Sequence, residues 1–129
     1  MLKPLQKYEA ESYALLRMVT GFMFSLHGAQ KILGLFSDGH AVFGTQMWFG
    51  GMIELAGGLA VMAGFSTRWA AFICSGEMAE AYIQFHWKGQ LGDQLLPGIN
   101  HGELALLYSF IFLVIATRGG GKWAVDRRD

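Results

Sequence analysis

Apolar residues gather in four long stretches along the chain, and a polar or glycine-rich connection separates each stretch from the next. The stretches cover residues 13–36, 47–65, 69–86 and 101–117. Only residues 66–68 separate the second stretch from the third, and so short a connection makes two helices antiparallel neighbours. The pattern therefore predicts an all-α fold, in which a single domain over residues 1–129 forms a four-helix bundle.

The last stretch is the most apolar, because the run Leu104–Ala116 has hydrophobic residues on every side of the expected helix. A helix of this kind is either buried or faces lipid. The run is shorter than about 18 residues, and the other three stretches contain charges, so a soluble bundle with buried helices is the alternative. Glycines recur in the second stretch, at Gly50, Gly51, Gly57, Gly58 and Gly64. Glycine weakens a helix in water but lets membrane helices approach closely, which favours a four-helix transmembrane bundle.

The composition agrees with a membrane location. Hydrophobic residues make up 53% of the chain and charged residues only 16%, whereas soluble domains have about 25% charged residues. Ten basic and ten acidic residues balance, so the chain lacks the basic surface that would bind a phosphate backbone, and no nucleic-acid partner is predicted. Cys74 is the single cysteine, which excludes an intrachain disulfide and the cysteine spacings of zinc sites.

Basic residues are unevenly distributed between the two ends of the predicted bundle. Four crossings place the N-terminus, the 66–68 turn and the C-terminus on one side, together with Lys3, Lys7, Arg68, Arg118, Lys122, Arg127 and Arg128. The other side has Lys31 and Lys88. Because basic residues concentrate on the cytoplasmic side of membrane proteins, both termini are predicted to be cytoplasmic.

Several ionisable residues interrupt the apolar stretches. They are Arg17, His27 and Lys31 in the first stretch, Glu54 in the second, Glu77, Glu80 and His86 in the third, and His101 and Glu103 at the start of the fourth. A charge at bilayer depth costs about 2.5–3.5 kcal/mol, so such residues usually face the interior of a bundle. Helical spacing puts those of the first stretch on one arc and those of the third on another. A polar cluster inside the bundle is therefore predicted.

The predicted cluster has several interpretations. Arg17 and Lys31 lie near helix ends and can extend to the headgroups, but the short carboxylate of Glu54 must pair with a cation or stay protonated. Glu77 and Glu80 lie one turn apart and would not both ionise easily at low dielectric. A structural ion-pair network among these five residues is one interpretation. A proton or redox-cofactor site is the second, and ligand or metal binding is the third.

Sequence motifs for specific chemistry are weak. The Glu-x-x-His spacing of di-iron bundles is absent, and no metal site is predicted. Asn100, His101, Gly102 and Glu103 form the pattern of a helix capping box, which we favour over a catalytic role for this segment. The chain has no phosphate-binding glycine loop and no nucleophile elbow, so catalytic residues are not assigned.

Four segments together resemble the DoxX family of small four-helix membrane proteins over nearly the whole chain. They are RMVTGFMFSLHGAQKI from Arg17, IELAGGLAVMAGFSTRWAA from Ile53, MAEAYIQFH from Met78 and HGELALLYSFIFLVIATRGGGKWAVD from His101. Relatives often have Gly-Pro-Gly near the end, where this chain has three consecutive glycines at residues 119–121.

The resemblance implies a protein of the bacterial inner membrane, surrounded by the lipid bilayer. Members of the family include a subunit of a thiosulfate:quinone oxidoreductase and a scaffold that joins soluble redox enzymes. By this analogy we expect a redox-linked, quinone-associated subunit or a scaffold for oxidoreductase partners. The cofactor stays open, with quinone as the candidate, and so does the question of whether the protein is itself an enzyme. The alternative is a non-catalytic accessory or assembly subunit, with partners in a larger membrane complex or a second copy of the chain.

Overall fold

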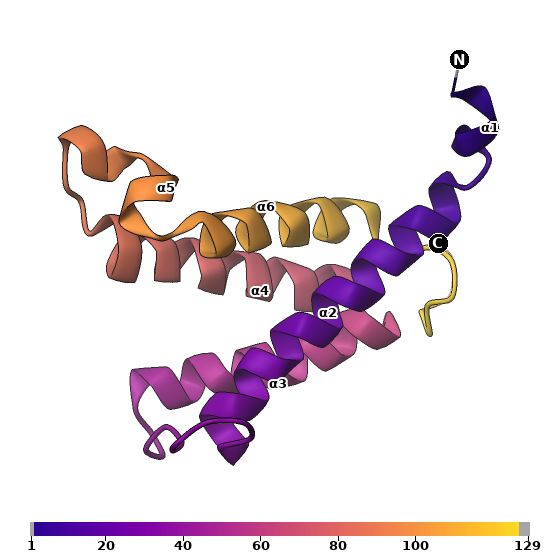
Figure 1. Ribbon diagram of the computed structural model, residues 1–129. Helices are drawn as coiled ribbons and strands as arrows, with labels where there is room; N and C mark the ends of the chain where they lie inside the picture. Colours follow the sequence, from indigo (N-terminus) through magenta and orange to yellow (C-terminus); the bar gives the residue numbers. More distant parts are fainter. Residues whose placement is uncertain (1, 127–129) are drawn as a thin grey trace.

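The computed structural model describes residues 2–126, and all regular structure within them is helical (Figure 1). The long helices are α2 (Glu9–Leu33), α3 (Gln46–Ala63), α4 (Thr67–Ala81) and α6 (Glu103–Arg118). The short ones are α1 (Lys3–Gln6), the π-helix η1 (Tyr82–Trp87), the 3₁₀-helix η2 (Gly92–Leu95) and α5 (Pro97–Asn100). The predicted all-α fold is confirmed. Arg127 and Arg128, which were counted in the predicted basic side, lie outside the described residues.

The helix boundaries differ from the predicted ones where local backbone geometry ends a helix early. Gly34 and Gly64 adopt left-handed conformations, with φ of 68° and 74°, and they end α2 and α3 before residues 36 and 65. The connection between α3 and α4 is therefore residues 64–66 and not 66–68. Within residues 2–126, no helix has both the length and the apolar character needed to cross a membrane.

The long helices form two antiparallel hairpins. α2 packs along α3, α4 packs along α6, and contacts between α3 and α4 join the two pairs. The hairpins come together near the chain termini and separate toward the opposite end (Figure 1). Where they meet, the Phe24 ring of α2 lies 5.2 Å from the Tyr108 ring and 4.7 Å from the Phe112 ring of α6, centroid to centroid. These aromatic contacts join α2 of one hairpin to α6 of the other.

Glycines allow α2 and α3 to approach backbone to backbone. A Cβ atom on Gly58 would lie 2.5 Å from the backbone nitrogen of Ser25, and one on Gly28 would lie 2.2 Å from that of Leu55. Gly57 faces a side chain of α4 instead. The prediction that these glycines of the second stretch pack against other helices is confirmed, because any larger residue would overlap main-chain or buried atoms.

Two arginines satisfy backbone carbonyl groups at the C-terminal ends of helices. The Nη1 atom of Arg17, which is fully buried, donates to the carbonyl oxygens of Val61 and Met62 at 2.8 and 2.7 Å. Its Nη2 atom donates to the carbonyl oxygen of Lys122 at 3.2 Å. Arg68 donates in the same way to the last carbonyls of α6. A cation at this end also complements the partial negative charge of the helix dipole.

The C-terminal segment caps the start of α4. The Asp126 carboxylate accepts hydrogen bonds from the backbone nitrogens of Ser66 and Thr67 at 2.7 and 2.8 Å, and from the Thr67 hydroxyl at 2.6 Å. Desolvation acts to raise the pKa of Asp126, but these hydrogen bonds and the nearby Arg17 charge outweigh it and lower the pKa below its ordinary value. Asp126 thus supplies from a distant part of the chain the N-cap that α4 lacks locally.

Candidate functional site

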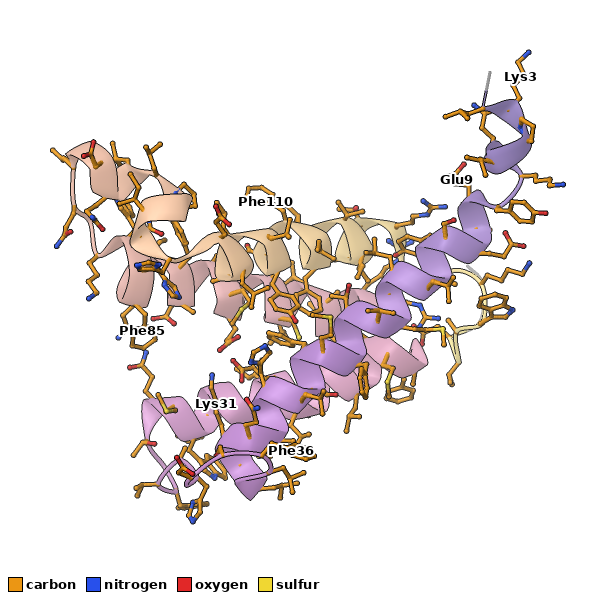
Figure 2. The ribbon with its side chains drawn as sticks, viewed as in Figure 1. Lys3, Glu9, Lys31, Phe36, Phe85 and Phe110 are labelled. Carbon is orange, nitrogen blue, oxygen red and sulfur yellow. The ribbon has the colours of Figure 1, made fainter. Side chains whose placement is uncertain are left out.

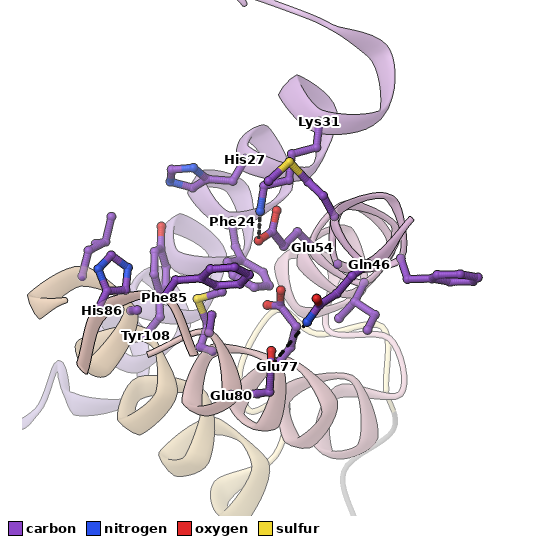
Figure 3. Close-up of a pocket in the computed structure, with 18 of the residues that line it drawn as sticks. Phe24, His27, Lys31, Gln46, Glu54, Glu77, Glu80, Phe85, His86 and Tyr108 are labelled. Carbon is purple, nitrogen blue, oxygen red and sulfur yellow. Dashed lines mark hydrogen bonds and ion pairs between the residues drawn. The ribbon is translucent and has the colours of Figure 1, made fainter. Parts of the chain in front are cut away.

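A cavity of about 550 Å³ opens between the two hairpins, at the end away from the chain termini (Figures 2 and 3). Its walls come from α2, α3, α4, η1 and α6. Figure 2 shows Lys31 of α2 and Phe85 of η1 on facing sides of this space. The volume lies in the range of small-molecule sites, about 300–1,000 Å³.

An ion pair between α2 and α3 lies in the wall of the cavity. The Nζ atom of Lys31 lies 2.7 Å from Oε1 of Glu54, and the side chains are 33% and 3% exposed. The second carboxylate oxygen of Glu54 is buried and has no hydrogen-bond partner. Lys31 therefore neutralises Glu54, and the protein encloses the second oxygen atom of this carboxylate.

A second carboxylate, that of Glu77 in α4, lies close to this pair. Figure 3 shows the Glu77 carboxyl group of α4 directed into the same space as that of Glu54. The Oε2 atom of Glu77 is buried without a partner, and so is the hydroxyl of Tyr108. Gly50 leaves room for this group, since a Cβ atom there would lie 3.2 Å from Oε1 of Glu77. We call the Glu54, Glu77 and Tyr108 side chains the polar floor of the cavity.

The rim of the cavity is closed on one side by two amides. The Gln46 side chain at the start of α3 donates to the Gln84 carbonyl oxygen at 2.6 Å, and Gln84 donates back at 3.2 Å. Gln46 also donates to Glu80 at 3.4 Å. These bonds connect α3 to η1 and to α4 across the opening between the hairpins, and Figure 3 shows the one from Gln46 to Glu80.

The remaining wall is largely aromatic and thioether in character. Its aromatic and thioether residues are Phe24, Met47, Phe49, Met78, Phe85 and Tyr108, and aliphatic residues complete it. The change from α-helix to π-helix after Ala81 alters the rotation per residue and places Phe85 and His86 beside the cavity. Sequence reasoning did not identify these aromatic residues as part of the site. Only Tyr108, a phenolic hydroxyl within the apolar run Leu104–Ala116, offered a signal for it.

The cavity brings together seven of the candidate residues named from the sequence. They are His27, Lys31, Glu54, Glu77, Glu80, His86 and His101. Arg17 does not belong to this group, and its expected place among the carboxylates is corrected: its guanidinium binds carbonyl oxygens at the other end of the bundle. The reason is tertiary, because the C-terminal end of α3 presents acceptors closer to Arg17 than any of the carboxylates that line the cavity.

Glu103 also lies outside the cavity lining, and the predicted capping box is wrong. Asn100 ends the short helix α5, and its side-chain oxygen accepts from the Gly102 backbone nitrogen at 2.9 Å. Its side-chain nitrogen donates to the Tyr82 hydroxyl and to the Gln94 carbonyl oxygen, both at 3.0 Å. Gly102 is the N-cap of α6 and Glu103 its first residue. Asn100 is therefore not the N-cap, and no side chain among the described residues caps the start of α6. The Asn100 side chain instead connects η1, through Tyr82, to η2, through Gln94.

Charge and ligand chemistry limit what the cavity can bind. Three carboxylates and one lysine line it, and the lysine pairs with one of the carboxylates. Three histidines also line it and can donate or accept hydrogen bonds. Within residues 2–126, no group of three or more His, Cys, Asp or Glu side chains is placed to hold a metal ion. The arrangement fits an organic molecule with an apolar body and a few polar atoms.

The chain matches a family model over the segment that contains most of this site. The DoxX model matches residues 12–87, which include α3, α4, η1 and nearly all of α2. The chain belongs to the DoxX family. It is 41% identical over 128 residues to a protein of Haemophilus influenzae described as uncharacterised, and the match covers 96% of this chain and 95% of that protein. No solved structure matches the chain. Membership of the DoxX family indicates a membrane protein.

Proposed function

We propose that this DoxX protein is a redox-linked subunit of the bacterial inner membrane that binds a quinone for an oxidoreductase partner. The observation behind this proposal is the cavity of about 550 Å³, which combines an aromatic wall with ionisable groups in its floor. A quinone is a flat ring with two polar oxygens, and it carries electrons together with protons. Phe24, Phe85 and Tyr108 would contact its ring, and Lys31 and the histidines would donate hydrogen bonds to its oxygens.

The carboxylates of the site would exchange protons with such a ligand. Glu54 and Glu77 each have a buried oxygen atom without a partner, and Glu80 lies at the exposed rim beside Gln46. A row of carboxyl groups from a buried floor to an exposed rim is suited to moving protons between a ligand and water. This chain's own residues would thus bind the ring, hold its oxygens and accept or supply protons.

The bundle is proposed to lie in the bilayer, with α2, α3, α4 and α6 crossing it. Large apolar side chains on the outward faces are exposed, among them Val19 and Phe22 of α2, Phe72 of α4, and Leu107 and Phe110 of α6. Figure 2 shows Phe110 pointing away from the bundle. Exposed apolar area costs about 25 cal/mol per Å² in water and nothing comparable in lipid. This surface therefore supports contact with acyl chains.

The first prediction concerns orientation in the membrane. α1, the 64–66 connection and the described C-terminal residues lie at one end of the bundle, and the loops 34–45 and 88–102 lie at the other (Figure 1). The basic residues concentrate at the first end, which is therefore cytoplasmic. In a Cys74→Ala background, a membrane-impermeant thiol reagent should label exposed Asp38→Cys and Asp93→Cys on intact cells and spare exposed Lys7→Cys. Labelling of Lys7→Cys alone would reverse the orientation.

The second prediction tests quinone binding by filling the cavity. Ala81 lines the cavity, whereas Ala56 is exposed on α3 and lies outside it. The purified protein is expected to bind duroquinone saturably, and Ala81→Trp should weaken binding at least about tenfold because the new ring occupies the same space. Ala56→Trp should bind as the parent does, as measured by titration calorimetry in mild detergent.

Two results would contradict the proposed quinone site. If duroquinone does not bind, or if both tryptophan variants bind it like the parent, the cavity is not a quinone site. A stable complex with a larger membrane enzyme and no bound quinone would then support the alternative, an accessory or assembly subunit.

A further inference from the structure

We propose that Glu54 and Glu77 form one buried proton-binding site, in which a single shared proton joins α3 of one hairpin to α4 of the other at neutral pH. This inference goes beyond the proposed function. It concerns how the two hairpins are held together, and it does not require that the cavity bind a quinone.

The two carboxyl groups meet inside the protein. Glu54 as a whole is 2% exposed, and the Glu77 carboxyl group lies within hydrogen-bonding contact of the Glu54 carboxyl group (Figure 3). The Oε2 atoms of both residues are enclosed, and neither atom has a hydrogen-bond donor among the described residues. Ionised carboxylates are acceptors alone, so this contact becomes a hydrogen bond only when a proton lies between the two groups.

The charges around the pair balance one carboxylate and not two. The Lys31 ammonium group lies 2.7 Å from Oε1 of Glu54, and Lys31 is the one lysine or arginine of the described chain that lines the cavity. A second ionised carboxylate would face the first at low dielectric, and one of two carboxyl groups placed in this way keeps its proton. A shared proton removes the repulsion between the groups. It also satisfies the two enclosed oxygen atoms, whose burial without a partner would cost free energy.

The shared proton lies at the contact between the hairpins. α3 belongs to one hairpin and α4 to the other, and contacts between these two helices join the pairs. When the proton is lost, two negative charges repel each other across this contact, and one ammonium group stays to balance them. The proton is therefore a link between the hairpins that alkaline conditions remove, beside the cavity that the hairpins enclose.

Other titratable groups surround the pair, and a measurement against pH must separate them from it. They are His27 and Lys31 of α2, Cys74 and Glu80 of α4, His86 of η1, His101 before α6, and Tyr108 of α6. An infrared spectrum makes this separation, because the carbonyl stretching band of an acid comes from a protonated carboxyl group and not from an imidazole, an amine, a thiol or a phenol.

Infrared spectroscopy of the purified protein in mild detergent at neutral pH is the first test. The unmodified protein is expected to show the band of a protonated carboxyl group, and the band should shift slowly in deuterated water because the proton is enclosed. Glu77→Gln should lose the band, since its Glu54 carboxylate still pairs with Lys31 and accepts from the new amide. Glu103→Gln is the matched control and should keep the band, because Glu103 is exposed and outside the cavity lining.

Unfolding by denaturant between about pH 6 and pH 9 tests the link itself. The glutamic acids of an unfolded chain are ionised in this range. The folded protein therefore holds one proton more than the unfolded chain, and its stability falls as the pH rises. For one proton, the unfolding equilibrium constant should rise about tenfold for each pH unit until the folded protein loses the proton. Glu77→Gln should lack this part of the slope, because its amide donates at every pH.

Three results would overturn the shared proton. They are an unmodified protein without the acid band at neutral pH, a band that persists in folded Glu77→Gln, and equal pH slopes of stability in the two proteins. The spectrum of the unmodified protein needs no variant, so it tests the inference even if Glu77→Gln does not fold. Quinone binding by a protein that lacks the band would overturn this inference and leave the proposed function in place.

Discussion

Replacing Gly58 with leucine is expected to destabilise the helical bundle by about 3 kcal/mol. The side chain would have to enter the contact between α2 and α3, where even a Cβ atom would lie 2.5 Å from the Ser25 nitrogen and 2.8 Å from the Gly21 carbonyl oxygen. Main-chain atoms cannot rotate away as a flexible side chain can. The hairpin would have to separate, and its interhelical packing would be lost.

The matched control for this prediction is Gly76→Leu in α4. A Cβ atom on Gly76 meets nothing within 4 Å, so leucine there has space and also has a higher helix propensity than glycine. Thermal unfolding followed by circular dichroism in detergent should show a large loss of stability for Gly58→Leu and little or no loss for Gly76→Leu. Equal melting temperatures would mean that the close contact between α2 and α3 does not hold the fold together.

Replacing Glu54 with alanine is the second change with a large expected effect. Glu54 is almost fully buried, and its removal leaves the Lys31 ammonium without its partner beside an apolar wall. Breaking a fully buried pair costs about 3–5 kcal/mol. Because the Lys31 side chain is 33% exposed, solvent relieves part of this cost, and we expect a loss of about 2 kcal/mol in the free energy of unfolding.

Glu103→Ala serves as the comparison for this prediction, since it removes an exposed carboxylate from the first turn of α6. Glu103→Ala should change the free energy of unfolding by no more than about 0.5 kcal/mol, as other surface substitutions do. Unfolding by denaturant in detergent measures both variants under the same conditions. A Glu103→Ala protein as unstable as Glu54→Ala would remove the distinction between a buried ion pair and a solvated helix terminus.

The ionisable residues show how far sequence reasoning reaches. Glu54 was predicted to need a partner because a short carboxylate in the middle of an apolar stretch cannot reach water, and Lys31 is that partner. Arg17 has the same charge as Lys31 and also lies in α2, yet it binds the carbonyl oxygens of Val61 and Met62. Helical periodicity says which face a residue occupies, but it does not say which helix end lies opposite that face.

The cap of α4 illustrates the same limit. Asn100 and Glu103 fit a local capping pattern that the chain does not use. At α4, where the chain has no local cap, Asp126 supplies one from 59 positions after Thr67. A helix end can be capped by a neighbour in the sequence or by a distant residue that the fold brings close. Which of them forms the hydrogen bonds depends on distances in the folded structure.

The sequence by itself determined the helical class, the approximate limits of the long helices, the close-packed glycines and the family, because each of these depends on local hydrophobic spacing or on short motifs. The tertiary structure alone decided that the hairpins separate at one end, that η1 presents Phe85 to the space between them, and that Glu54 and Glu77 share one cavity. The physical reason is that these features depend on contacts between residues far apart in the chain. Such contacts are set by how the helices fill space against one another, and no local periodicity encodes that choice.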